Sequence, residues 1–169
     1  MATPTNIDAF LLITDQSGDI KNESADKNHP GHLQIQNFSF GVELQSTPSI
    51  GTGLAAGKAV PQQFQFEVNN SKASPVLFKH CCDGTHCKHA VLYIRKAGGT
   101  PQDYYVWKFK DLVITKFEPS CSDDIIEKIA FAFSAIWCEY KPQKPDGSLD
   151  SGVNGGHDVK LNAPWGGSF

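Results

Sequence analysis

Residues able to bind a metal ion or to act as nucleophiles are concentrated between Ser74 and Gly99. This stretch holds three of the five cysteines and three of the six histidines of the 169-residue chain. Its potential zinc ligands are His80, Cys81, Cys82, His86, Cys87 and His89. A cysteine near histidines, or at a helix terminus, can also be activated as a nucleophile. A small zinc- or thiol-dependent enzyme that uses His80, Cys82, His86, Cys87 and His89 is therefore one hypothesis.

The spacing of these side chains argues against a shared metal ion. Zinc ligands usually form pairs of the C-x2-C type, with a second pair further on, whereas Cys81 and Cys82 are adjacent. After Gly84 the pattern alternates as in a strand, which directs His86 and Cys87 to opposite faces. The pattern favours Cys81 and Cys82 as small buried helix residues and the histidines as surface residues. We expect no metal site, no cofactor and no enzyme activity.

The elements that position this stretch are a short helix and a strand. Ser74 is a suitable N-cap, and Pro75 suits the first helical position, where its missing N–H costs nothing. Gly84 suits the left-handed residue that ends a helix. From Lys88 onward, alternating side chains predict a strand over 88–97.

The rest of the chain predicts strands joined by loops. We place the other strands at 8–14, 32–43, 62–70, 103–118, 125–140 and 157–162. A change of apolar phase near Gln36 predicts a bulge, and one near Asp111 predicts a bulge or a turn. Bulges bend long strands as barrel closure requires. Because strands and helices do not alternate, we predict one mainly β domain over 1–169, closed or sandwiched. Residues 141–169 form its C-terminal loop, last strand and tail.

Residues 45–61 are unusual, because they are small, rich in glycine and weakly hydrophobic, with no period of their own. We predict an extended loop that docks its apolar residues on a second copy of the protein, since structureless loops of this length are usually functional or disordered. The candidate interface residues are Thr47, Ile50, Leu54, Lys58 and Val60.

Composition excludes several classes of partner. The formal net charge of −3 and pI near 6.0 argue against nucleic acid, and no apolar run is long enough for membrane insertion. No Lys or Arg precedes Lys21, so we expect no cleavable signal peptide and a chain that starts in the cytoplasm. An odd number of cysteines favours reduced thiols. The aromatic residues Tyr104, Tyr105 and Trp107 leave a carbohydrate-binding module as a further alternative.

Motifs along nearly the whole chain resemble one family. They are Glu23, Ser24, Asp26 and His29 before Phe38-Ser39-Phe40-Gly41; Ser74-Pro75 with Cys81-Cys82, Gly84 and His86; Arg95 to Gly99; Glu127 to Phe133 with Ile136, Trp137 and Tyr140; and Gly156 with Asp158 to Lys160 and Asn162. In this order they resemble the Hcp family, the haemolysin-coregulated proteins of type VI secretion systems.

The resemblance implies an antiparallel β-barrel of two sheets with one short flanking helix, assembling into a homohexameric ring. Such rings stack into the inner tube of a contractile injection machine. The implied partners are other copies of the chain, a spike protein of the VgrG type, the contractile sheath and small effector proteins in the lumen. The implied location is the bacterial cytoplasm during assembly, followed by secretion to the extracellular space or a target cell. Residues 45–61 occupy the position of a loop that reaches a neighbouring subunit or ring.

Overall fold

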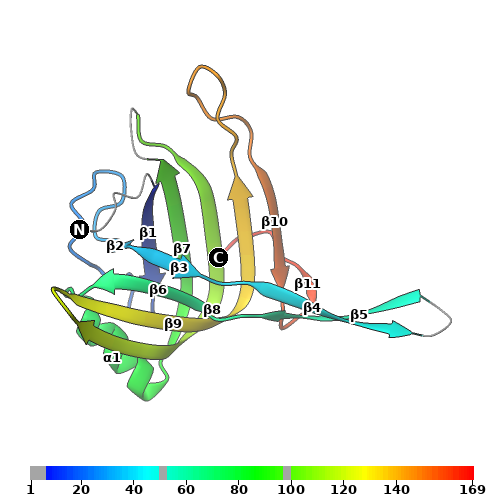
Figure 1. Cartoon of the computed structure of the whole chain (residues 1–169), viewed down its shortest axis with the longest axis horizontal. Coiled ribbons are helices and arrows are strands. Elements are labelled where there is room, and N and C mark those ends of the chain that lie inside the picture. The colour runs from blue at the N-terminus through cyan, green and yellow to red at the C-terminus, as the bar shows by residue number, and fades with distance from the viewer. Residues whose placement is uncertain (1–6, 50–52, 97–99) are drawn as a thin grey trace.

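The structure is a computed structural model that describes residues 7–49, 53–96 and 100–169. Strands dominate these residues, and a single short helix flanks them (Figure 1). The elements are β1 (Ile7–Thr14), β2 (Leu33–Ile35), β3 (Asn37–Ser39), β4 (Val42–Ser49), β5 (Gly53–Pro61), β6 (Phe64–Asn69), α1 (Ser74–Asp83), β7 (His86–Lys96), β8 (Asp103–Cys121), β9 (Ile125–Tyr140), β10 (Val153–Asp158) and β11 (Ala163–Pro164).

The strands close into a six-strand antiparallel barrel, which confirms the predicted fold class. The main sheet has the order β11-β10-β9-β8-β7-β1-β2, and β6 pairs with both β9 and β3. Only Gln36 separates β2 from β3, and its N–H donates to the Glu67 carbonyl in β6 at 2.8 Å. The pairs β1–β2 and β3–β6 therefore close the barrel on either side of Gln36.

The barrel encloses a core of aliphatic and aromatic side chains. Phe64, Phe109 and Phe131 are fully buried, and the Phe64 ring lies 4.8 Å from the Phe131 ring and 5.0 Å from the Phe109 ring. The predicted phase change near Asp111 is confirmed, because Asp111 adopts a φ of 54° between the buried residues Phe109 and Leu112. This left-handed residue keeps side chains on both parts of the long strand β8 directed into the core.

The helix begins one residue earlier than the capping pattern predicted. Ala73, not Ser74, is the N-cap. The Ser74 hydroxyl instead accepts the Ser71 N–H at 2.9 Å and donates to Glu127 at 2.7 Å, tying α1 to β9. Gly84 ends the helix with a φ of 68°, as expected. No described helix has the length and apolar character needed to cross a membrane.

Two sequence predictions are wrong. Residues 45–61 are not an irregular loop, because most of them belong to the antiparallel pair β4–β5, which forms an arm that projects from the barrel (Figure 1). Apolar alternation was absent because no barrel core lies behind these strands to select it. The last long strand is Val153–Asp158, not 157–162, and residues 159–162 turn toward β11. Gly155 and Gly156 in β10 had concealed its strand character.

Candidate assembly surface

The structure separates the cysteines and histidines of the cluster. His80 is buried, and its Nε2 lies 3.0 Å from Asp15 Oδ2. His86 is exposed, with Nδ1 3.2 Å from Asp111 Oδ1, whereas Cys87 lies in the core. Cys82 is exposed. In the part of the chain that the structure describes, no three His, Cys, Asp or Glu side chains converge as a metal site.

Two expectations about this cluster were wrong, namely that both helix thiols would be buried and that all three histidines would be exposed. The buried face of α1 carries Leu77 and His80, with Cys81 packed at its edge. Cys82 lies about 100° further around the helix and therefore faces solvent. Burial of His80 is compensated by Asp15. Although burial opposes ionisation, hydrogen bonds from Ser17 and His80 hold the pKa of Asp15 at about 2.

Cys87 and His89 both have structural surroundings. Burial, reinforced by the charge of Asp15, raises the pKa of the Cys87 thiol to about 11. That direction is opposite to the activation that a nucleophilic thiol needs. The His89 ring stacks on Phe169 with centroids 4.0 Å apart and planes at 16°, so the C-terminal tail lies over the start of β7.

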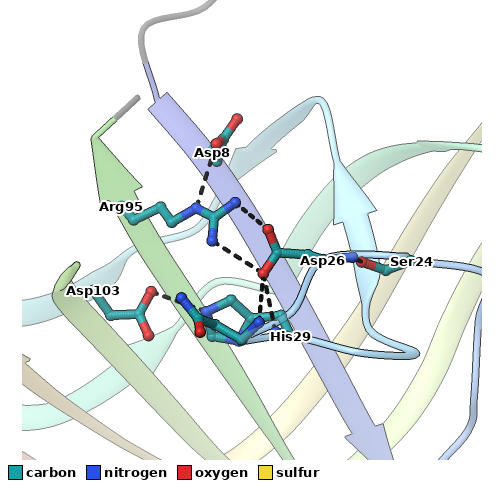
Figure 2. Close-up of polar contacts among 7 residues, drawn as sticks. Asp8, Ser24, Asp26, His29, Arg95 and Asp103 are labelled. Carbon is teal, nitrogen blue, oxygen red and sulfur yellow. Dashed lines mark hydrogen bonds and ion pairs between the residues drawn. The ribbon is translucent and has the colours of Figure 1, made fainter. Parts of the chain in front are cut away.

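A buried polar cluster fastens the loop before β2 to one end of the barrel. Figure 2 shows the Arg95 guanidinium between Asp26 and Asp8. Arg95 is only 8% exposed, and its Nη1 donates to Asp26 Oδ1 at 3.0 Å while Nη2 bonds to Asp26 Oδ2. His29 Nε2 lies 2.9 Å from Asp103 Oδ1 in β8. Charge pairing of this kind compensates for burial of the Arg95 guanidinium, so removal of a carboxylate partner would be destabilising.

The arm exposes apolar side chains on a pair of strands that has no other sheet beneath it. Val42 is 47% exposed, Leu44 56% and Val60 48%. Val42 lies opposite Pro61 and Leu44 opposite Ala59, so one face of the arm is apolar where it leaves the barrel. An isolated two-stranded hairpin is only marginally stable in water. The arm is therefore well suited to packing against another surface.

The predicted interface residues are distributed along this arm. Thr47 and Leu54 belong to β4 and β5, where Thr47 pairs with Ala55 and Leu54 with Pro48. Lys58 and Val60 are exposed on β5. Ile50 lies outside the described residues.

The base of the arm is held by Gln62. Its N–H donates to the Gly41 carbonyl at 2.8 Å, and its side-chain amide donates to Glu43 Oε1 at 2.6 Å. These bonds join the end of the arm to its beginning, so the direction of the arm relative to the barrel is constrained at this point.

Beside the arm base lies an open apolar groove of about 580 Å³ that sequence reasoning missed. Its lining residues are Phe40, Gly41, Val42, Trp107, Ile136, Trp137, Cys138, Gly155, Gly156 and His157. Val42 belongs to both the groove and the arm, so the two form one continuous surface, here called the assembly surface. The sequence signal for this groove was the pair of glycines at 155–156, which leave space beside the aromatic residues.

The aromatic residues proposed as a sugar platform pack against one another. The Tyr105 and Tyr140 rings meet edge to face at 5.7 Å and 87°, and Trp107 meets Phe40 in the same manner at 4.7 Å. Tyr104, Tyr105 and Trp107 are partly buried against the core. Their arrangement is typical of aromatic packing in a core.

The fold and this surface define a structural β-barrel protein with a large exposed apolar surface. Residues 10–140 match a family described as type VI secretion system effector, Hcp. The chain is 32% identical over 161 residues to protein hcp1 of Pseudomonas aeruginosa, with 92% of this chain and 97% of that protein covered.

Solved structures agree with this match. The crystal structure of Hcp1 from Salmonella typhimurium has a TM-score of 0.77 at 30% identity, covering 95% of this chain and 100% of that one. A type VI secretion system effector from Yersinia pestis has a TM-score of 0.72 at 29% identity, covering 90% and 100%. The chain belongs to the Hcp family and is a secreted structural component of a type VI secretion system.

Proposed function

We propose that this chain is a subunit of the inner tube of the secretion machine. Copies associate into a homohexameric ring, rings stack into a tube, and the tube is expelled with small effector proteins in its lumen. The spike protein of the VgrG type and the contractile sheath are its further partners. Assembly takes place in the bacterial cytoplasm, and export to the extracellular space or target cell uses no cleavable signal peptide.

The observation that carries this proposal is the continuous assembly surface. A monomer in water would leave Val42 and Leu44, which share one face of the arm, exposed beside the open apolar groove. Contiguous apolar surface of this kind marks a protein–protein contact. A second copy of the chain is the occupant that best agrees with membership of the Hcp family. The separation of the cysteine and histidine side chains supports a structural, non-catalytic role.

Light scattering coupled to size exclusion, followed by negative-stain microscopy, tests the proposal. We expect six-membered rings for the wild type and loss of rings for Leu44→Lys, because the lysine charge would be buried in the contact. Val76→Lys is the matched control, since Val76 is also partly exposed, at 37%, but lies on α1. A wild-type monomer at high concentration, with no rings on the grid, would contradict the proposal.

A further inference from the structure

Among the described residues, His157 lacks the aspartate partner that three of the other histidines have. It lines the apolar groove, and in the ladder it lies between Ile136 of β9 and Pro164 of β11. Its Nε2 is buried and has no hydrogen-bond partner among the described residues. By contrast, His29, His80 and His86 each lie against an aspartate. No aspartate of this kind lies against His157 among the described residues.

The described residues that line the groove with His157 offer no negative charge at neutral pH, and the neighbouring Asp158 lies on the opposite face of β10, where it accepts the Leu161 N–H. β9 contributes Ile136 and Cys138, β8 contributes Trp107, the arm base contributes Phe40 and Val42, and β11 contributes Pro164. Cys138 is the one other titratable residue that lines the groove, and burial raises the pKa of its thiol. The thiol therefore remains neutral at physiological pH. A charged imidazolium here would face apolar groups and a neutral thiol.

A second copy of the chain that covers the groove would raise the free-energy cost of a charge at His157. The free chain leaves His157 partly exposed, so water can still reach part of the side chain. A second copy seated over Val42 and Trp107 would remove that water. Burying an uncompensated charge is strongly unfavourable, so the proton must leave before the groove closes.

We propose that His157 makes self-association of this chain dependent on pH, with copies joining when its imidazole is neutral and separating when it is protonated. This inference rests on the proposed assembly through the groove. An ordinary histidine titrates near pH 6.5. If each interface must release one proton, its association constant falls by up to about tenfold for each unit by which the pH is lowered.

The test measures the assembled fraction by mass photometry and light scattering from pH 8 to pH 5. We compare the wild type with His157→Gln and His157→Phe, which are neutral at every pH. His86→Gln is the control, because His86 is 64% exposed in its side chain and lies outside the groove. Circular dichroism at each pH checks that the subunits remain folded.

We expect the wild type and His86→Gln to lose assemblies between pH 8 and pH 5, with assembly of at least one neutral His157 variant persisting at pH 5. Parallel loss in the wild type and both His157 variants would overturn the inference while leaving the proposed function intact. Retention of wild-type rings at pH 5 would overturn it as well. Absence of wild-type rings at pH 8 would overturn the proposed function and this inference together.

Discussion

The cluster around Arg95 allows a quantitative prediction for Asp26→Asn. The Asp26 carboxylate accepts two hydrogen bonds from the Arg95 guanidinium and two from the backbone N–H groups of Asn28 and His29. An asparagine retains one oxygen for the backbone but turns an NH2 group toward Arg95. The buried guanidinium would then have Asp8, at 3.4 Å, as its remaining carboxylate.

The expected loss of stability follows from the pKa of Asp26. Hydrogen bonds from Arg95 are the main cause that lowers this pKa from 3.8 to about 2. Such a drop corresponds to roughly 2.4 kcal/mol, at about 1.4 kcal/mol per pH unit. Because the Asp26 side chain is 20% exposed, solvent screening reduces the expected effect to about 1.5–2 kcal/mol. The folded pKa lies below the unfolded one, so the contribution is present above pH 4 and is lost as the pH falls from about 4 to about 2.

Urea unfolding followed by tryptophan fluorescence measures this difference. At pH 7 the variant should be less stable by about 1.5–2 kcal/mol, and the two proteins should converge as the pH approaches 2. Glu118→Gln is the control, because Glu118 pairs with Lys116 on the surface and should show no measurable change. A difference between Asp26→Asn and the wild type that stays constant from pH 7 to pH 2 would refute the reasoning.

Three further predictions concern other parts of the chain. Gln62→Glu places two carboxylates together at the arm base and should reduce ring formation, as measured by light scattering. The double variant Glu43→Gln with Gln62→Glu again pairs a donor with an acceptor and should recover ring formation. Gly167→Ala should lower the melting temperature, because a Cβ would lie 2.6 Å from the Trp137 ring at a φ of +74°, whereas Gly166→Ala meets nothing within 4 Å and should not. The Cys87 thiol should resist a disulfide reagent in the native protein and react on unfolding in urea, and equally rapid labelling in both states would contradict its burial.

Local sequence signals were sufficient to predict the secondary structure where one residue fixes the backbone conformation or where one face of an element is buried. Gly84 located the end of α1, and the spacing of Phe109 and Leu112 located the change of apolar phase at Asp111. The resemblance to the Hcp family added the barrel closure, which depends on the pairing of β3 with β6 and of β1 with β2. These pairs join segments that no local pattern connects.

The assembly surface was harder to predict because its parts come from distant segments. Within residues 45–61, apolar and polar residues do not alternate as in a half-buried strand, because the arm has no barrel core beneath it to select one face. The groove brings Phe40 together with Trp107 and His157, which only the tertiary fold places side by side. The metal hypothesis considered residues close in sequence, whereas the fold gave His80 and His86 separate aspartate partners.

The position of the assembly surface follows from the way in which β9 changes partners. Its first part, up to Phe131, pairs with β6, and its last part, from Ala135, pairs with β10 on the same edge. The arm strand β5 ends just before β6 begins, so the arm leaves the barrel where β9 passes from β6 to β10 (Figure 1). The groove lies between the arm base and β10 at this same place. Strand β9, which pairs first with β6 and then with β10, thus places the groove beside the base of the arm, where the bonds of Gln62 constrain the direction of the arm.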